Sequence, residues 1–411
     1  MIRKIAFIAL FTITTMAALA QQEITISISN PSTTARCDEP VVIPFAPYSC
    51  FSPYRDVCSA LVTLDGQEIP CQLDDLNQDD IFDELCFLVD LKGKESKTYK
   101  VQLFSEGQPR QYPARVFTEM LIRNDKVKEK NRHNNFIESI TARGDCANSY
   151  NIQHHHGVDF ESELNGIRIY FDKRQTLDLY GKFQKRLELK ETQFYTSKDQ
   201  KAEGYGDDVL WVGNTFGLGA FRGWNGQEPT MIEPVRSRTQ RIISYGPLRT
   251  IVEVFDRGWQ AVEGKTALNM LLRYTQYAGH RDTDVEVFFD RPVADYQFST
   301  GIINVKGSEE FSDKQGLRAC WGTDWPSSDH ENFKPETVGL GIYIPQMYIK
   351  NEEPANKDNY AFVVGTAYDR LNYKIIYCSN NETFGYHSSK EWFEFLKTWK
   401  HELETPIEVK Y

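Results

Sequence analysis

Beyond its first twenty residues, the 411-residue chain lacks any long apolar segment. A helix that spans a membrane needs about 20 consecutive apolar residues. At the start, a basic pair at positions 3 and 4 precedes the mostly apolar run 5–16, and Ala-Leu-Ala at 18–20 fits a small-x-small cleavage site. We therefore expect a signal peptide over residues 1–20, cleaved near Ala20. The mature chain is expected to have no membrane span and to be periplasmic or secreted.

Positive charge is also scarce. The chain has 47 basic and 58 acidic residues, a net charge of −11, which becomes −13 when the two basic residues of the leader are removed. Proteins that bind nucleic acid carry an excess of positive charge, so nucleic acid is not an expected partner. An anionic sugar remains compatible, because a local group of arginines can oppose the overall sign.

Several common catalytic and metal motifs are missing. The sequence has no CxxC pair, no His-Glu-x-x-His motif and no Gly-x-Ser-x-Gly elbow. The glycine-rich stretch 213–226 lacks both the strand-turn-helix frame of a dinucleotide site and the Lys-Ser/Thr of a P-loop. We expect no nucleotide site and no required cofactor, while a divalent metal remains possible.

Five of the eight cysteines precede residue 90. They are Cys37, Cys50, Cys58, Cys71 and Cys86. In an exported chain this clustering fits one or two disulfides. It fits equally well a set of free buried thiols, which behave as small apolar residues.

The N-terminal region, residues 21–115, has the pattern of short strands. Ile24, Ile26 and Ile28 alternate with polar residues, which is the period of a half-buried strand. Residues 62–69 contain Asp-Gly between two apolar runs, which is typical of a β-hairpin. The region is predicted to be a small immunoglobulin-like β-sandwich.

Residues 116–411 are predicted to form a large, mainly antiparallel β domain that carries the active cleft. The region is rich in aromatic residues and valine, and its turns come too quickly for helical crossovers. One C-terminal helix is expected, because Ser388 and Glu391 form a capping-box pattern ahead of an apolar stripe. The fold class is therefore all-β.

The richest group of proton-carrying side chains lies between residues 154 and 163. It comprises His154, His155, His156, Asp159, Glu161 and Glu163. In an extended strand, His154 and His156 would point one way and His155 the other. The first two could then share a metal ion with His280 or a carboxylate. Alternatively, one histidine is a general acid or base, or all three are surface or packing residues.

The three acidic residues of this group share one face of a regular strand. Glycosidases use two carboxyl groups about 5 Å apart when they retain configuration and about 6.5–9.5 Å apart when they invert it. Strand spacing excludes neither arrangement. A solvated acidic face is the other interpretation.

Residues 166–182 are predicted to form a β-hairpin with one apolar and one polar face. Matching the faces requires a loop of odd length. A loop of three residues, 173–175, would pair Tyr170 with Asp178 and Arg168 with Tyr180 on the polar side. That side faces either solvent or a cleft.

Arginine and tryptophan side chains elsewhere suit a sugar site. A guanidinium group binds a carboxylate with two hydrogen bonds, and indole rings stack on pyranose faces. The candidates are Arg222, Arg249 and Arg281, with Trp211, Trp224 and Trp259. Each tryptophan fits core packing as well.

Five motifs resemble a family of exported Bacteroidetes proteins that is catalogued only as a domain of unknown function. They are QHHHG at 153–157, YFDKRQTLDLYGK at 170–182, GYGDD at 204–208, GPLRT at 246–250 and YAGHRD at 277–282. The resemblance covers nearly all of the mature chain. It implies a place in gene clusters that dismantle uronate-containing polysaccharides, and a large domain similar to the supersandwich of galactose mutarotases and several polysaccharide lyases. It implies no particular catalytic residue.

The leading hypothesis is an enzyme that cleaves an acidic oligo- or polysaccharide by β-elimination. An arginine at 222, 249 or 281 would neutralise the substrate carboxylate. A histidine of 154–156 or Tyr170 would be the base, and Tyr180 or His280 the acid. Arg168, Asp178 and Trp224 are expected to contact the substrate.

Three alternatives remain open. They are a glycoside hydrolase that uses Asp159, Glu161 or Asp178, a non-catalytic glycan-binding protein, and a mutarotase or isomerase. The enzyme hypothesis requires segments 154–156, 168–182 and 280–282 to surround one hollow. The oligomeric state is left open.

Overall fold

A computed structural model describes residues 22–45, 57–123, 135–144 and 149–411. The expected signal peptide lies outside these residues, as does Cys50. Within the part that is described, no helix is long and apolar enough to cross a membrane.

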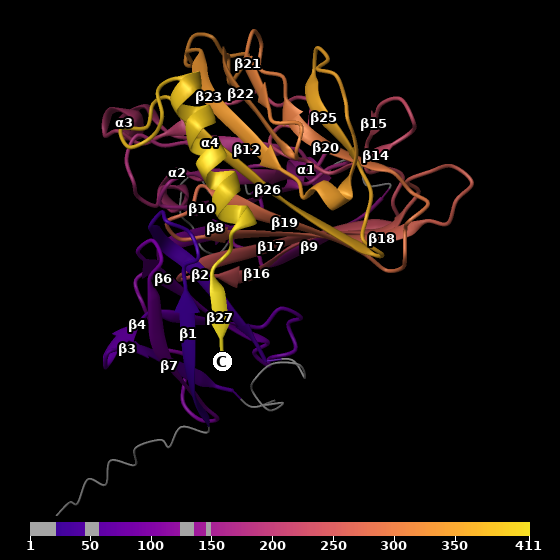
Figure 1. Ribbon diagram of the computed structural model, residues 1–411. Helices are drawn as coiled ribbons and strands as arrows, with labels where there is room; N and C mark the ends of the chain where they lie inside the picture. Colours follow the sequence, from indigo (N-terminus) through magenta and orange to yellow (C-terminus); the bar gives the residue numbers. More distant parts are fainter. Residues whose placement is uncertain (1–21, 46–56, 124–134, 145–148) are drawn as a thin grey trace, which may run out of the picture.

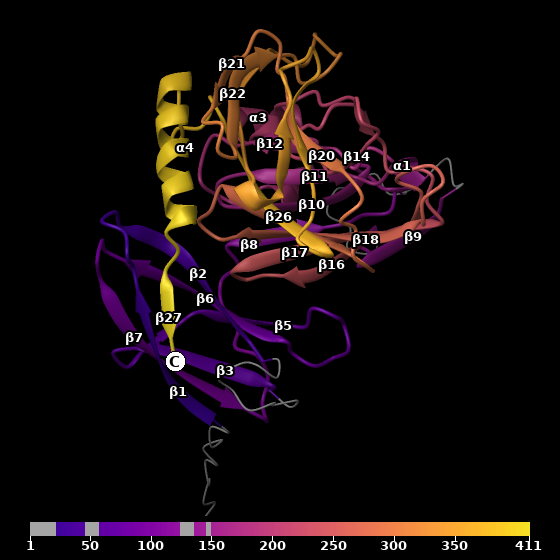
Figure 2. The same cartoon turned by 45° about the vertical axis from the view of Figure 1, so that its right-hand side comes forward.

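Two sheets form the N-terminal part, drawn in indigo and violet in Figures 1 and 2 except for the yellow strand β27. The larger contains, in order, β27 (Glu408–Lys410), β1 (Gln22–Ser29), β7 (Ser96–Phe104), β3 (Ser59–Leu64) and β4 (Gln67–Ile69). The smaller contains β2 (Arg36–Pro44), β6 (Glu84–Leu91) and β5 (Cys71–Asp74). The two sheets share one core, because alternate apolar residues of each strand point between them.

The strand pairing bears on one sequence prediction for this part and shows where the last strand of the chain lies. The 62–69 hairpin is confirmed, since Val62 pairs with Ile69 and Leu64 with Gln67 around the Asp65-Gly66 turn. The last strand, β27, belongs to the edge of this N-terminal sheet, so the chain ends beside its first strand (Figure 1).

No disulfide joins any two of the cysteines in the described ranges. Cys71, Cys86, Cys320 and Cys378 are buried free thiols. Burial raises the pKa of the Cys86 thiol to about 12, so this side chain behaves as a small apolar group.

Three further sheets share a second, larger core. One nine-stranded sheet contains β21 (Glu309–Ser312), β22 (Leu317–Asp324), β23 (Glu336–Tyr343), β26 (Arg370–Ser379), β19 (Asp282–Phe289), β18 (Leu268–Tyr277), β17 (Arg249–Trp259), β16 (Ser237–Tyr245) and β9 (Ser139–Arg143). A second contains β15 (Pro229–Thr230), β14 (Arg222–Trp224), β20 (Phe298–Ile303), β25 (Asn359–Val364) and β24 (Ile349–Glu352). The third, which we call the site sheet, contains β13 (Asp207–Asp208), β12 (Leu177–Gly181), β11 (Gly166–Tyr170), β10 (Gly157–Ser162) and β8 (Val116–Glu119). All pairings between these strands are antiparallel, which confirms the mainly antiparallel, all-β class.

The C-terminal helix α4 (Ser389–Glu404) is present as expected. Ser388 accepts a hydrogen bond from the Glu391 backbone, and the apolar stripe packs Trp392 and Leu396 against the nine-stranded sheet. The predicted capping box is incomplete, because the Glu391 carboxylate accepts from His387 and not from Ser388. The other α-helices in the described ranges are short: α1 (Ser149–Ile152), α2 (Leu189–Thr192) and α3 (Lys198–Ala202).

Candidate active site

The site sheet has one apolar face and one polar face, and both are buried. Every residue of β10, β11 and β12 is buried. Val158, Ile167 and Leu179 belong to the main core. The opposite face carries charged and phenolic groups, so this side of the sheet is an interior polar layer and not the solvated surface that is usual for antiparallel sheets.

The β11–β12 hairpin pairs Arg168 with Asp178, not with Tyr180. The predicted odd loop is correct in parity, but the register differs from the prediction by two residues. A shift of two leaves the faces unchanged. The loop is longer than predicted because Gln175 is buried and donates a hydrogen bond of 2.5 Å to Asp256 on β17, which holds the loop end against the nine-stranded sheet.

The pairing aligns four charged residues across four strands. Glu119 lies opposite Asp159, Asp159 opposite Arg168, and Arg168 opposite Asp178. Residues directly opposite in an antiparallel pair project on the same side, with Cβ atoms about 5 Å apart. We call Glu119, Asp159, Arg168 and Asp178 the charge row. It has one cation for three carboxyl groups.

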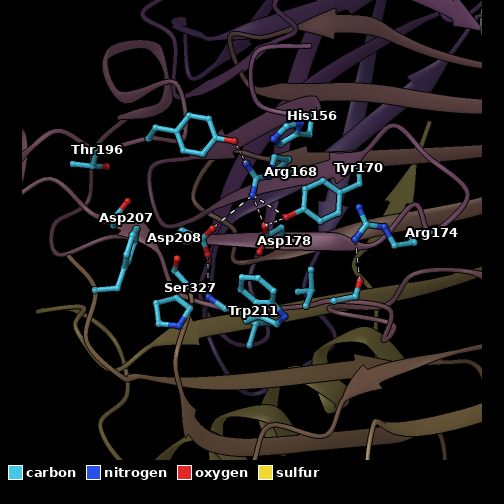
Figure 3. Close-up of a pocket in the computed structure, with 16 residues that line it drawn as sticks. His156, Arg168, Tyr170, Arg174, Asp178, Thr196, Asp207, Asp208, Trp211 and Ser327 are labelled. Carbon is cyan, nitrogen blue, oxygen red and sulfur yellow. Dashed lines mark hydrogen bonds and ion pairs between the residues drawn. The ribbon is translucent and has the colours of Figure 1, made fainter. Parts of the chain in front are cut away.

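Arg168 lies at the end of the charge row that faces the cavity (Figure 3). Its guanidinium contacts Asp178 and also lies 3.6 Å from Asp208. The Tyr170 hydroxyl donates to the same Asp178 oxygen at 2.6 Å. The ring of Phe194 lies 4.1 Å from the guanidinium carbon. Arg168 is therefore fixed between two carboxyl groups and an aromatic ring.

A cavity of about 420 Å³ opens above Arg168. Its lining includes His156, Tyr170, Arg174, Tyr195, Asp208 and Trp211. Figure 3 shows Trp211 and His156 on opposite sides of the Arg168–Asp178 pair. Trp211 is 55% exposed and Tyr195 is 40% exposed, so two aromatic rings are available to a ligand.

Asp208 is placed at the cavity by close packing of two strands. It follows Gly206, where a Cβ atom would lie 1.8 Å from the carbonyl oxygen of Gly181 on β12. Only glycine permits that approach. Asp208 then pairs with Tyr180 across the sheet, and one of its oxygens accepts from the Leu210 backbone at 3.2 Å.

The electrostatic environment of Asp208 favours the protonated form of its carboxyl group. Burial raises the pKa of this carboxyl well above its usual value, and the nearby Asp178 raises it further, while Arg168 opposes both. The cavity therefore contains a carboxyl group with a raised pKa beside the Arg168–Asp178 pair. A carboxyl group of this kind is suited to general acid catalysis.

The histidine run does not form the predicted extended strand. Residues 154–156 make a turn between α1 and β10, and His156 has a φ of 70°. His155 is fully buried, with its Nε2 atom 3.4 Å from Asp159 and 3.8 Å from Glu119. His156 lines the cavity, whereas the ring of His154 packs against those of His155 and Tyr195. The extended strand on which His154 and His156 were expected to point the same way is thus not formed.

None of the acidic residues at 159, 161 and 163 lines the cavity, and Asp159 and Glu161 are completely buried. Asp159 is in the charge row. Glu161 is buried and accepts from Lys182 and from the backbone of Glu188 and Leu189. Glu163 pairs with Arg115.

Two predicted tyrosines have roles different from those expected. Tyr170 lines the cavity, but burial and the adjacent Asp178 raise the pKa of its hydroxyl far above the usual value, which disfavours a role as base. Tyr180 is buried and hydrogen-bonds to Glu188 and to the Gly206 carbonyl. It is not among the cavity-lining residues.

The remaining predicted residues are not among those that line the cavity. Arg222 is buried and donates to Thr176 and to the Thr215 carbonyl, and burial lowers its pKa to about 10. Trp224 and Trp259 are buried, Trp259 completely. Of the three tryptophans proposed as a platform, only Trp211 lines the cavity.

Arg249, His280 and Arg281 serve the fold elsewhere. Arg249 pairs with Asp74 and Glu84 and thereby connects β17 to the N-terminal sheets. Arg281 pairs with Glu382 at 2.6 Å. His280 contacts the Asp38 carbonyl at 2.9 Å. Segment 280–282 therefore does not join the hollow formed by 156 and 168–178, and the three-segment prediction is correct only for the first two segments.

The position of His280 predicts a pH-dependent contribution to stability. Burial lowers the pKa of His280, and so does the nearby Lys374, which also pairs with Asp282. Asp282, at 3.2 Å from the ring, and the Asp38 carbonyl raise it. The net result is a pKa of about 9. A histidine whose pKa is raised in the folded state contributes its full stabilisation of the fold at pH values below its unfolded pKa of about 6.5. This stabilisation is lost as the pH rises through 9.

We expect His280→Gln to lower the free energy of unfolding by about 1–2 kcal/mol at pH 6, because solvent screening reduces the linkage value of about 3 kcal/mol. The difference from wild type should vanish near pH 10. Urea unfolding at both pH values tests this, and an equal difference at both would contradict it.

Several residues of the cavity were not predicted from the sequence. Asp207, Asp208, Arg174 and Tyr195 were not among the candidates, although Asp207 and Asp208 end the GYGDD motif. The adjacent pair of aspartates was the available signal. It did not reveal the site because β13 returns to β12 only after residues 182–206, and nothing local predicts that pairing.

These features define an all-β protein in which the polar face of one sheet opens into a cavity with carboxyl and aromatic groups. The chain belongs to the family described as Domain of unknown function (DUF4861), whose model matches residues 28–409. The predicted membership of a family of unknown function is thus confirmed, whereas its Bacteroidetes origin and its link to polysaccharide gene clusters remain expectations.

A comparison with curated proteins finds no match. Among solved structures, the chain is similar to a protein in glycosyl hydrolase family 38 from Enterococcus faecalis, with 9% identity and a TM-score of 0.46, over 94% of this chain and 47% of that one. It is also similar to an alpha-mannosidase from Enterococcus faecalis V583, with 10% identity and a TM-score of 0.45, over 96% and 46% of the two chains. The chain spans about half the length of these two proteins.

Proposed function

We propose that the protein is a carbohydrate-active enzyme whose cavity above Arg168 carries out general acid–base catalysis, with Asp208 as the acid. The observation that carries this proposal is the raised pKa of Asp208 beside two exposed aromatic rings. The cavity volume lies in the range of roughly 300–1,000 Å³ that is usual for small-molecule sites. Aromatic rings next to carboxyl groups match a sugar, which has apolar C–H faces and a rim of hydroxyl groups.

Hydrolysis of a glycosidic bond is the proposed reaction. Asp208 donates its proton to the leaving glycosidic oxygen as the bond from that oxygen to the anomeric carbon breaks. Water forms the new bond to the anomeric carbon, and its proton passes to His156 on the other side of the cavity. Arg168, Asp178 and Tyr170 position Asp208 and keep its surroundings polar but dry.

The charges of the cavity favour hydrolysis over β-elimination of a uronate. Elimination needs a cation for the substrate carboxylate, and Arg168 is already shared by Asp178 and Asp208. Arg174 pairs with Asp172 at 2.6 Å. Both arginines of the lining are thus already engaged by carboxyl groups.

β-Elimination of an acidic polysaccharide is nevertheless the second candidate. His156 and Arg174 line the same cavity as Asp208. His156 would remove the C5 proton, Arg174 would turn from Asp172 to the substrate carboxylate, and Asp208 would protonate the leaving oxygen.

One assay separates these reactions. Purified protein is incubated with neutral oligosaccharides and with pectic, algal and glycosaminoglycan uronates, and both reducing ends and near-ultraviolet absorbance are recorded. Hydrolysis predicts new reducing ends without absorbance, and elimination predicts both, because its product has a conjugated double bond. A protein that binds these glycans with unchanged affinity in His156→Ala and Asp208→Asn, and yields no product, would be a binding protein and would refute the enzyme proposal.

A further inference from the structure

The buried end of the charge row is a cluster of three potential metal ligands. Glu119, His155 and Asp159 each offer one donor atom, and these atoms all lie within 4.8 Å of one another. The Nε2 atom of His155 lies 3.4 Å from the Asp159 carboxylate and 3.8 Å from that of Glu119. Donor atoms around a tetrahedral zinc ion are roughly 3.3–3.5 Å apart, so a small contraction would suffice.

Most polar atoms of these three side chains have no hydrogen-bond partner in the structure. Both ring nitrogens of His155, both carboxylate oxygens of Asp159 and Oε1 of Glu119 are buried without a hydrogen-bond partner. Their side chains are at most 6% exposed. Buried polar atoms are nearly always paired, and each of these three side chains turns one unpaired donor atom toward the other two, which indicates a missing partner.

The nearby cations do not supply that partner. Across residues 22–45, 57–123, 135–144 and 149–411, no lysine or arginine forms an ion pair with Glu119 or Asp159. Arg168, the neighbour of Asp159 on β11, is directed to Asp178 and Asp208. Lys182 is bound by Glu161. The cluster thus combines two carboxyl groups and one imidazole with no positive charge of their own.

We propose that Glu119, His155 and Asp159 bind a divalent transition-metal ion, with zinc or manganese the best match. An imidazole nitrogen with two carboxylate oxygens is a donor set for such ions, whereas calcium and magnesium take oxygen ligands only. The predicted pair His154 and His156 is replaced by His155, because the turn at 154–156 directs only the middle ring inward.

The ion would tie three separate segments together. Glu119 ends β8, Asp159 lies in β10, and His155 lies in the turn ahead of β10. His156, the next residue, lines the cavity, and Arg168 lies directly opposite Asp159. The ion therefore has a positioning role behind the cavity wall, and this inference does not depend on the proposed reaction.

Metal content and thermal stability test the site without an activity assay. Full-length protein without a histidine tag is stripped by unfolding in chelator and refolded with Zn²⁺, Mn²⁺, Ca²⁺ or Mg²⁺. Elemental analysis should find about one equivalent of Zn²⁺ or Mn²⁺ after desalting, and the Tm should rise by several degrees with either ion. Ca²⁺ and Mg²⁺ should give neither effect.

Variants locate the site. Asp159→Asn and His155→Gln should each lower the affinity for the ion at least tenfold, while His154→Gln, one residue away and outside the cluster, should retain one equivalent. The titration of the wild type keeps the proposal testable if either ligand variant fails to fold. Wild-type protein that holds no Zn²⁺ or Mn²⁺ and shows no Tm shift would overturn it, as would ligand variants that bind as much ion as the wild type.

Discussion

Replacing Asp208 by asparagine should lower kcat by a factor of about 10² to 10⁴, the usual contribution of a general acid, on whichever glycan the assay identifies. The amide cannot donate a proton to a leaving oxygen. It nevertheless has nearly the shape of the protonated carboxyl that burial and Asp178 favour in the wild type. We therefore expect a folded protein with its free energy of unfolding within about 0.5 kcal/mol of wild type and with KM little changed.

Stability measurements make this prediction sharper. If Asp208 were ionised, Asp208→Asn would remove a charge 3.6 Å from Arg168, and the loss should reach about 1.5–3 kcal/mol, as expected for hydrogen bonds to charged groups. Asp290→Asn is the matched control, because Asp290 pairs with the surface residue Arg291 far from the cavity lining. It should keep full activity. Full activity in Asp208→Asn would remove Asp208 from the mechanism.

The polar face of the hairpin could be predicted from sequence because it depends on the period of two within one short segment. Alternation places Arg168, Tyr170 and Asp178 on one side whatever the loop length, as long as that length is odd. The true register required Gln175 to bind Asp256 on a strand eighty residues away. No local pattern encodes that contact, so the register was wrong while the face was right.

The difference between local patterns and long-range contacts also explains why the predicted cationic residues do not lie at the cavity. Arg249 and His280 have the chemistry of sugar and proton ligands, but each is engaged by the N-terminal sheets, through Asp74 and the Asp38 carbonyl. Their partners are more than 150 residues earlier in the chain. The chemistry of these side chains was therefore predictable from the sequence. Whether each side chain binds a ligand or a residue of the N-terminal sheets was not.

The largest effect on stability is expected for Lys182→Met. The Nζ atom of Lys182 donates to Glu161 at 2.5 Å and to the carbonyls of Ser162 and Arg186 at 2.7 Å, with no exposed side-chain surface. Methionine fits the space but leaves the Glu161 carboxylate buried without its cation. Breaking a buried pair in this way costs about 3–5 kcal/mol, which should appear as a lower urea midpoint.

The loss should also depend on pH. Burial already raises the pKa of Glu161, and Lys182 opposes that rise, so removing Lys182 raises the pKa further. A carboxyl group with a raised pKa in the folded state destabilises the fold progressively as the pH increases above its unfolded pKa of about 4.3. The loss of stability in Lys182→Met should therefore be larger at pH 8 than at pH 5.

Lys173→Met is the matched control, because it breaks a Lys–Glu pair of 2.8 Å with Glu233 in which both side chains are about half exposed. A pair of that kind contributes at most about 1 kcal/mol. If both variants lost the same free energy of unfolding, burial would not determine how much the Lys182–Glu161 pair stabilises the fold.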